Sequence, residues 1–156
     1  MLKQDSKHLI PLIKTLESLK KVKDIKNDSV SKSDIAWHID HSLKVFNLVS
    51  KSLVLSNPKH YVNQFNTWRF ILFNLNFIPR GKAKAPKMVF PPNEISDELL
   101  EKQIQLAFEN IEQLKTANKN AYFKHFVFGV LNKKRTIRFL KLHTNHHLKI
   151  IKDILK

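Results

Sequence analysis

Apolar residues recur along the chain with the spacing of α-helices, and polar stretches separate these segments. Leu12, Leu16 and Leu19 follow an i, i+4, i+7 spacing, which predicts a first helix over residues 9–22. The following stretch 23–33 is rich in Lys, Asn, Asp and Ser and is expected to form a polar loop.

A second helix is predicted after this loop. Ser31 or Ser33 can cap it, and Asp34 lies favourably near its positive end. The Asn57-Pro58 pair is expected to end it, because proline cannot continue a helix. Its apolar stripe consists of Ile35, Ile39, Phe46, Val49 and Leu53.

The middle of the chain is less regular. Residues 60–77 predict a shorter helix with an apolar spacing of Phe65, Trp68, Leu72 and Leu75. The next segment, IPRGKAKAPKMVFPP, contains four prolines and one of the two glycines. Proline disfavours helix at its own position and at the one before it, so this segment is predicted to be an extended crossover.

Two further helices complete the pattern. Ser96 is expected to cap a helix that ends near Thr116, and Asn132 a last helix over residues 133–155. We therefore predict an all-α fold, a four-helix bundle with a long Pro-rich crossover between the second and third main helices, in one domain spanning residues 1–156. The inward residues of the third main helix are Leu100, Ile104, Ala107, Ile111 and Leu114.

The amino-acid composition argues against several classes of function. The chain has only two glycines, which argues against Gly-rich phosphate loops, and no cysteine, so any metal must be held by imidazole or carboxylate. The N-terminal stretch shows no apolar signal-peptide core, and the longest apolar run, residues 70–78, is too short to span a membrane, so we expect a cytoplasmic protein. The formal charge of +15 comes mainly from scattered Lys, whereas base-reading surfaces favour Arg, so nucleic-acid binding is not the favoured interpretation.

Histidines occupy positions of the last helix where the apolar pattern predicts leucine or isoleucine. In the last helix the inward series is interrupted by His143 and His147, which lie four residues apart on one face, as two ligands of one ion would. The second helix offers His38 or His41 as a third ligand, and periodicity alone does not separate them. The simpler interpretation is that these are surface or hydrogen-bonded core residues, because eight histidines in 156 residues will often give one such pair.

Three strings carry a family resemblance: AWHIDHSLKVF, FVFGVLN and RFLKLHTNHHLKII. They resemble the DinB-like family of metal-binding four-helix bundles, and the match runs from about Ser33 onward. The resemblance implies one divalent metal ion per chain on His38, His143 and His147. Imidazole suits zinc, nickel, iron and copper alike, and we expect zinc or nickel. His41 is an alternative to His38, and His146 is an outer or substrate-facing group.

His125 begins the HFVFG segment and has two interpretations. It can lie at the mouth of the site. In the simpler account it hydrogen-bonds a loop, while Phe126 and Phe128 plug the end of the bundle and Gly129 supplies an unusual backbone angle.

The resemblance also implies an activity. DinB-like relatives include S-transferases that use a low-molecular-weight thiol such as bacillithiol, mycothiol or glutathione. It thus implies a metal-dependent enzyme that acts on a small molecule, either as a thiol-dependent transferase or as a hydrolase. It also implies a homodimer, which we expect to form through the apolar stretch 65–77. Lys82, Lys84 and Lys87 are candidates for receiving an anionic cosubstrate, and Asp40 is expected to be a surface or outer carboxylate. The alternative is a non-enzymatic bundle whose basic surface binds an acidic partner or nucleic acid.

Overall fold

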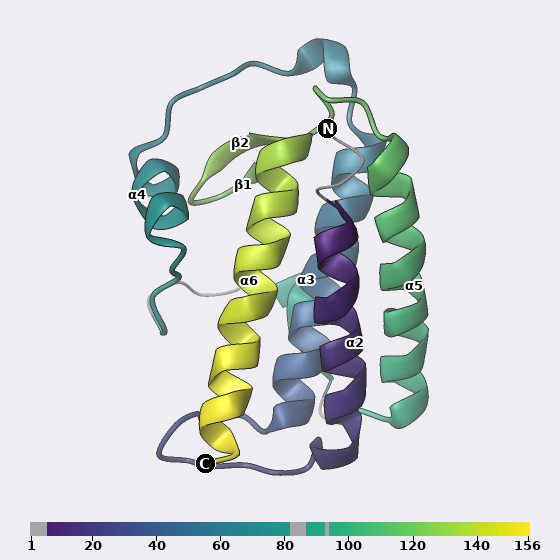
Figure 1. Cartoon of the computed structure of the whole chain (residues 1–156), viewed down its shortest axis with the longest axis vertical. Coiled ribbons are helices and arrows are strands. Elements are labelled where there is room, and N and C mark those ends of the chain that lie inside the picture. Colours follow the sequence, from purple (N-terminus) through teal and green to yellow (C-terminus); the bar gives the residue numbers. More distant parts are fainter. Residues whose placement is uncertain (1–5, 82–86, 93) are drawn as a thin grey trace.

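The computed structural model describes residues 6–81, 87–92 and 94–156. It is mostly helical, with one small sheet, so the all-α prediction is broadly confirmed (Figure 1). The longest helix, α6, packs against α3, which also packs against α5, and α2 lies against both α5 and α6. These four helices are α2 (Ile10–Ser18), α3 (Ile35–Leu55), α5 (Asp97–Thr116) and α6 (Lys133–Ile154).

The ends of the helices follow local capping signals. Ser96 accepts a hydrogen bond from the Leu99 amide and Asn132 from the Arg135 amide, as predicted. The predicted cap of α3 was wrong: Asp34 itself accepts from the Trp37 amide at 2.8 Å, and Ser31 is used elsewhere. Short 3-10 turns extend α2 at both ends: η1 (Ser6–Leu9) and η2 (Leu19–Val22).

The core lies between the four helices and follows the predicted stripes of α3, α5 and α6. In the first helix only Leu16 of the predicted stripe is buried, and Leu12 and Leu19 are partly exposed, because Leu9 and Ile13 face the core instead. The largest fully buried side chains come from η1, α2, α3 and α5: Leu9, Ile13, Leu16, Ile35, Ile39, Leu43, Phe46, Leu53, Leu100, Ile104, Ile111 and Leu114. Burial of these apolar surfaces is the main driving force for the arrangement that brings α3 and α6 together.

The short helix α4 (Thr67–Leu75) turns a different face inward from the one predicted. Arg69 and Phe73 are its buried residues. Of the predicted stripe, Phe65, Trp68 and Leu75 are 78%, 61% and 66% exposed, and Leu72 alone packs partly against the core. The prediction failed because the inward face is anchored by a charged residue, which a hydrophobic pattern assigns to solvent.

A β-hairpin, which the sequence did not predict, precedes α6. It pairs β1 (Tyr122–His125) with β2 (Gly129–Asn132) in antiparallel register. Arg69 of α4 donates to the carbonyls of Phe128 and Val130, and Asn66 donates to that of Val127. Residues about sixty positions earlier in the chain therefore hold the hairpin. The hairpin was not predicted because its strands are short and their own sequences favour the β conformation only weakly.

The structure describes only part of the predicted Pro-rich crossover. Lys82 and Lys84 lie outside the described residues, whereas Lys87 begins the short turn η4 (Lys87–Val89). Another such turn, η3 (Pro58–His60), follows α3. Val89 is buried, and its carbonyl oxygen lies 2.9 Å from a ring nitrogen of His41, one of the histidines described below. Among the described helices, none has an apolar stretch long enough to cross a membrane.

Candidate metal centre

Two packed helices bring the predicted histidines together. His38 and His41 lie one turn apart on α3, and His143 and His147 lie one turn apart on α6. The ring of His41 has its centroid 5.4 Å from that of His143 and 4.9 Å from that of His147, and the two α6 rings are 4.7 Å apart. The contact between α3 and α6 thus gathers side chains separated by about a hundred residues of chain.

Three of these residues form a set that is able to hold a metal ion. His41, His143 and His147 each offer one ring nitrogen, and these nitrogens all lie within 4.8 Å of one another. His41 and His147 are buried, and His143 is partly exposed. Imidazole is a ligand for zinc, nickel, copper and iron, so the donor set fits a divalent transition metal.

The hydrogen bond of His41 fixes which of its nitrogens is available. Its Nδ1 atom lies 2.9 Å from the Val89 carbonyl, which can only accept. Nδ1 therefore carries the proton and Nε2 keeps its lone pair, the state that a metal ligand requires. The ring also stacks on Trp37, with centroids 4.9 Å apart and planes 15° apart. His41 is consequently held by the crossover on one side and by its own helix on the other.

His38 lies behind His147. Its Nδ1 atom is 3.0 Å from Nδ1 of His147, and its Nε2 atom is 2.9 Å from the Ser31 hydroxyl. Ser31 in turn accepts from the Ser33 amide. Both ring nitrogens of His38 are thus engaged, whereas His143 makes no hydrogen bond with the described residues. Of the residues predicted for the site, the structure places His38 against His147, and it groups His41, the alternative to His38, with the α6 pair.

Burial keeps these imidazoles neutral. Desolvation lowers the pKa of His38 to about 4 and holds those of His143 and His147 well below the usual imidazole value. The neighbouring histidines add to the effect, because a second positive charge in the cluster is unfavourable. Desolvation also lowers the pKa of His41, partly offset by its bond to Val89. Neutral rings are the form that binds metal.

The two remaining histidines have different surroundings. The ring of His146 meets that of His147 edge to face, 5.1 Å away, and faces a surface cleft. His125 accepts from the amides of Val127 and Phe128 through Nδ1, so it closes the turn of the hairpin. This matches the simpler account, and Gly129 does have a positive φ of 68°.

Two neighbouring predictions need correction. Phe126 is 64% exposed and plugs nothing, whereas Phe128 is buried. For Asp40 only the surface alternative was wrong, because the residue is fully buried: its carboxylate pairs with Lys44 at 2.7 Å and accepts from Gln103 of α5. Its charge is thus engaged on the α5 side of α3. The bonds of Ser31 and Val89 to the histidines had no sequence signal, because both arise from irregular segments.

Comparison with known proteins finds a family. The sequence model of one family, described as a protein of unknown function (DUF1569), matches residues 67–153. The matched region contains His143 and His147 and ends within α6. No curated protein and no solved structure matches the chain.

Proposed function

We propose that this chain, which belongs to the DUF1569 family of proteins of unknown function, is a metal-dependent enzyme built on a DinB-like four-helix bundle. One divalent ion is held by His41, His143 and His147. His38, named as a ligand by the family resemblance, positions His147 from behind. The whole chain acts as one domain on a small-molecule substrate.

The observation that supports this most is the convergence of three neutral imidazoles from two helices within 4.8 Å. A carboxylate is absent from this set, so the ligands bring no negative charge. An ion held by neutral ligands keeps its full charge, and when bound it can polarise a substrate oxygen or lower the pKa of a water or thiol. Three protein ligands are also the usual number in catalytic zinc sites, which keep a further position for substrate.

The surrounding residues orient the ligands. Val89 fixes the tautomer of His41, and His38 offers His147 a partner for its Nδ1 atom. Outer partners of this kind commonly raise metal affinity by one to two orders of magnitude, about 10- to 100-fold. The chain thus supplies both the ligands and the contacts that fix their direction.

The proposed reaction rests on the family resemblance, and the proposed metal rests on the chemistry of the ligands. Zinc or nickel is the proposed ion, since imidazole suits both. The proposed reaction is transfer to a low-molecular-weight thiol or hydrolysis, and a positioned metal would serve either. Asp40 is excluded from the proposed acid–base chemistry because its carboxylate is committed to Lys44 and Gln103.

The experiment is an activity screen of zinc- and nickel-loaded protein. Thiol transfer is measured with bacillithiol, mycothiol or glutathione and monochlorobimane, and hydrolysis with a nitrophenyl ester. Turnover is expected with metal-loaded wild type and with His60→Ala, an exposed histidine outside the site, and it should vanish in His143→Ala. Turnover by metal-free wild type or by His143→Ala that is as fast as that of metal-loaded wild type would contradict the proposal. No turnover of any of these substrates by metal-loaded wild type would favour the non-enzymatic interaction protein.

We also propose that the chain forms a homodimer through α4. Its outward face carries large exposed apolar side chains, which solvated surfaces seldom gather on one short helix. They are Trp68, Phe70, Ile71 and Leu75, with Phe65 and Phe77 at the two ends.

A further inference from the structure

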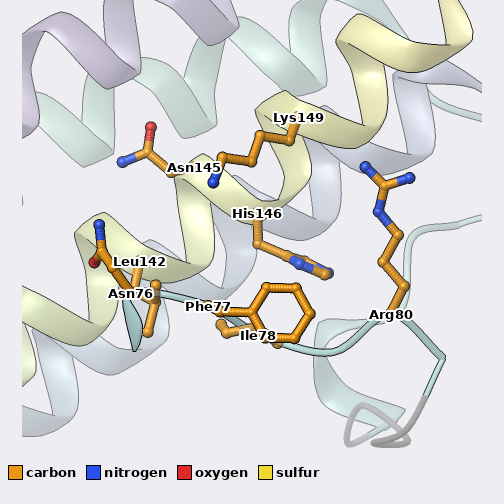
Figure 2. A pocket seen from close by; sticks show the side chains of 8 residues that line it. All are labelled: Asn76, Phe77, Ile78, Arg80, Leu142, Asn145, His146 and Lys149. Carbon is orange, nitrogen blue, oxygen red and sulfur yellow. The ribbon is translucent and has the colours of Figure 1, made fainter. Parts of the chain in front are cut away.

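A cleft lies on the face of α6 next to the histidine centre. Its volume is about 340 Å³. One wall is α6, and the other is the segment that follows α4, as Figure 2 shows. Pockets for small ligands begin at about 300 Å³, so the cleft suits a small molecule.

The cleft is basic. Arg80, His146 and Lys149 line it, and none of its described lining residues is acidic. The Arg80 guanidinium is held by Asp153 at 2.8 Å through one nitrogen, which leaves its other N–H groups available. Lys149 forms no ion pair with any described residue. The Lys149 ammonium lies toward Asn145 and the Arg80 guanidinium on the other side of His146 (Figure 2). An anion in the cleft would therefore meet an ammonium that pairs with no described residue and the remaining N–H groups of a guanidinium that Asp153 holds in place.

The rest of the lining is apolar. Phe77 and Ile78 form the wall opposite α6, and Leu142 contributes from the helix. The His146 side chain points from α6 toward Phe77 and Ile78 (Figure 2). The surface thus offers an apolar wall beside a cationic one, which suits an organic anion better than an inorganic one.

The cleft also adjoins the proposed metal ligands. The ring of His146 lies 5.1 Å from that of His147. Burial is the main cause of the lowered pKa values of His146 and His38, and the Arg80 guanidinium contributes to both. The positive charge of Arg80 therefore acts on the cleft and on the histidine cluster alike.

We propose that this cleft binds a small organic anion, with its carboxylate or phosphate on Arg80 and Lys149 and its apolar body against Phe77, Ile78 and Leu142. The anion is the substrate or cosubstrate of the metal centre; this last step rests on the proposed function, whereas the binding itself does not. Arg80 and Lys149 thus take the role that the sequence suggested for the lysines of the crossover.

The test is titration calorimetry of chelator-treated, metal-free protein with phenyl phosphate. Phenyl phosphate should bind more tightly than inorganic phosphate and than neutral benzyl alcohol. Lys149→Gln and Arg80→Gln should each weaken binding about tenfold or more, the usual loss for a charge-assisted contact. The matched control is Lys152→Gln, an exposed lysine one turn further along α6 and outside the cleft, and it should bind like wild type.

Equal losses in Lys152→Gln and Lys149→Gln would overturn the inference, because they would indicate only general attraction to a basic protein. Benzyl alcohol binding as tightly as phenyl phosphate would also overturn it. His143→Ala separates this inference from the proposed function. This variant should lose metal and keep phenyl phosphate binding. Wild-type protein that binds phenyl phosphate but no metal would contradict the metal centre and support the anion site, and protein that binds metal but no phenyl phosphate would do the opposite.

Discussion

The Nδ1 atom of His38 lies 3.0 Å from the Nδ1 atom of His147, in the buried contact between α3 and α6. A hydrogen bond between two ring nitrogens needs one proton. If His147 supplies it, its Nε2 atom keeps a lone pair for a metal, and His38 Nε2 carries a proton that it can donate to Ser31. Metal binding through Nε2 of His147 would select this arrangement.

Replacing His38 should therefore weaken metal binding without abolishing it. For His38→Ala we expect a loss of about 10- to 100-fold in affinity, measured by competition with a chromogenic chelator, with one ion still bound per chain at saturation. A variant that binds no ion at saturating metal would instead place His38 among the ligands.

The buried histidines should make the metal-free protein sensitive to mild acid. The unfolded chain takes up protons near pH 6.5, whereas burial holds the pKa of His38 at about 4. The unfolded state binds more protons between these values, so the free energy of unfolding falls as the pH falls through this interval. His38 alone accounts for about 3 kcal/mol across it.

Denaturant titrations from about pH 7.5 to about pH 4.5 measure this effect. His38→Gln, which cannot titrate, should show a shallower decline than wild type. A free energy of unfolding that stays flat in wild type over this range would show that these imidazoles are not desolvated.

Arg69 is expected to be a main anchor of the hairpin. It is buried, and its guanidinium donates to the carbonyls of Gln64, Phe128 and Val130. Arg69→Met should lower the free energy of unfolding by about 2 to 4 kcal/mol, because these carbonyls lose a charged donor. Arg135→Met is the matched control: its guanidinium bonds to side chains at the surface, and it should cost less than about 1 kcal/mol. Equal costs would mean that Arg69 is not the anchor.

The proposed dimer predicts a concentration-dependent mass. Sedimentation of wild type should show a dimer, and Trp68→Glu should weaken association by about thirtyfold or more, as loss of a central aromatic contact does. Leu55→Glu changes an apolar residue outside α4 that is even more exposed than Trp68, and it should leave the mass unchanged. A wild-type monomer at high concentration would contradict the proposal.

The sequence predicted those elements whose signals are local. The helices α5 and α6 begin where Ser96 and Asn132 cap them, and their buried faces follow the apolar spacing. The hairpin and the inward face of α4 were missed because they depend on Arg69, whose partners lie about sixty residues away. A pattern of apolar residues gives no indication that a charged side chain will be buried.

The histidine site was likewise predicted only as far as local spacing allows. The spacing of His143 and His147 indicated a pair on one face, and the structure does bring them together. The choice between His38 and His41 stayed open because both lie on nearly the same face of α3. The contact that distinguishes them is the Val89 carbonyl, and it comes from the crossover, whose path the sequence does not specify.

Metal content tests the central claim most directly. Protein purified without a chelator or a nickel column is reconstituted with zinc or nickel, and bound metal per chain is measured by elemental analysis. We predict about one ion per chain in wild type and in the exposed control His60→Ala, and none in His41→Ala, His143→Ala or His147→Ala. Wild-type protein that binds no metal, or a His41→Ala variant that binds as wild type does, would contradict the proposed three-histidine centre.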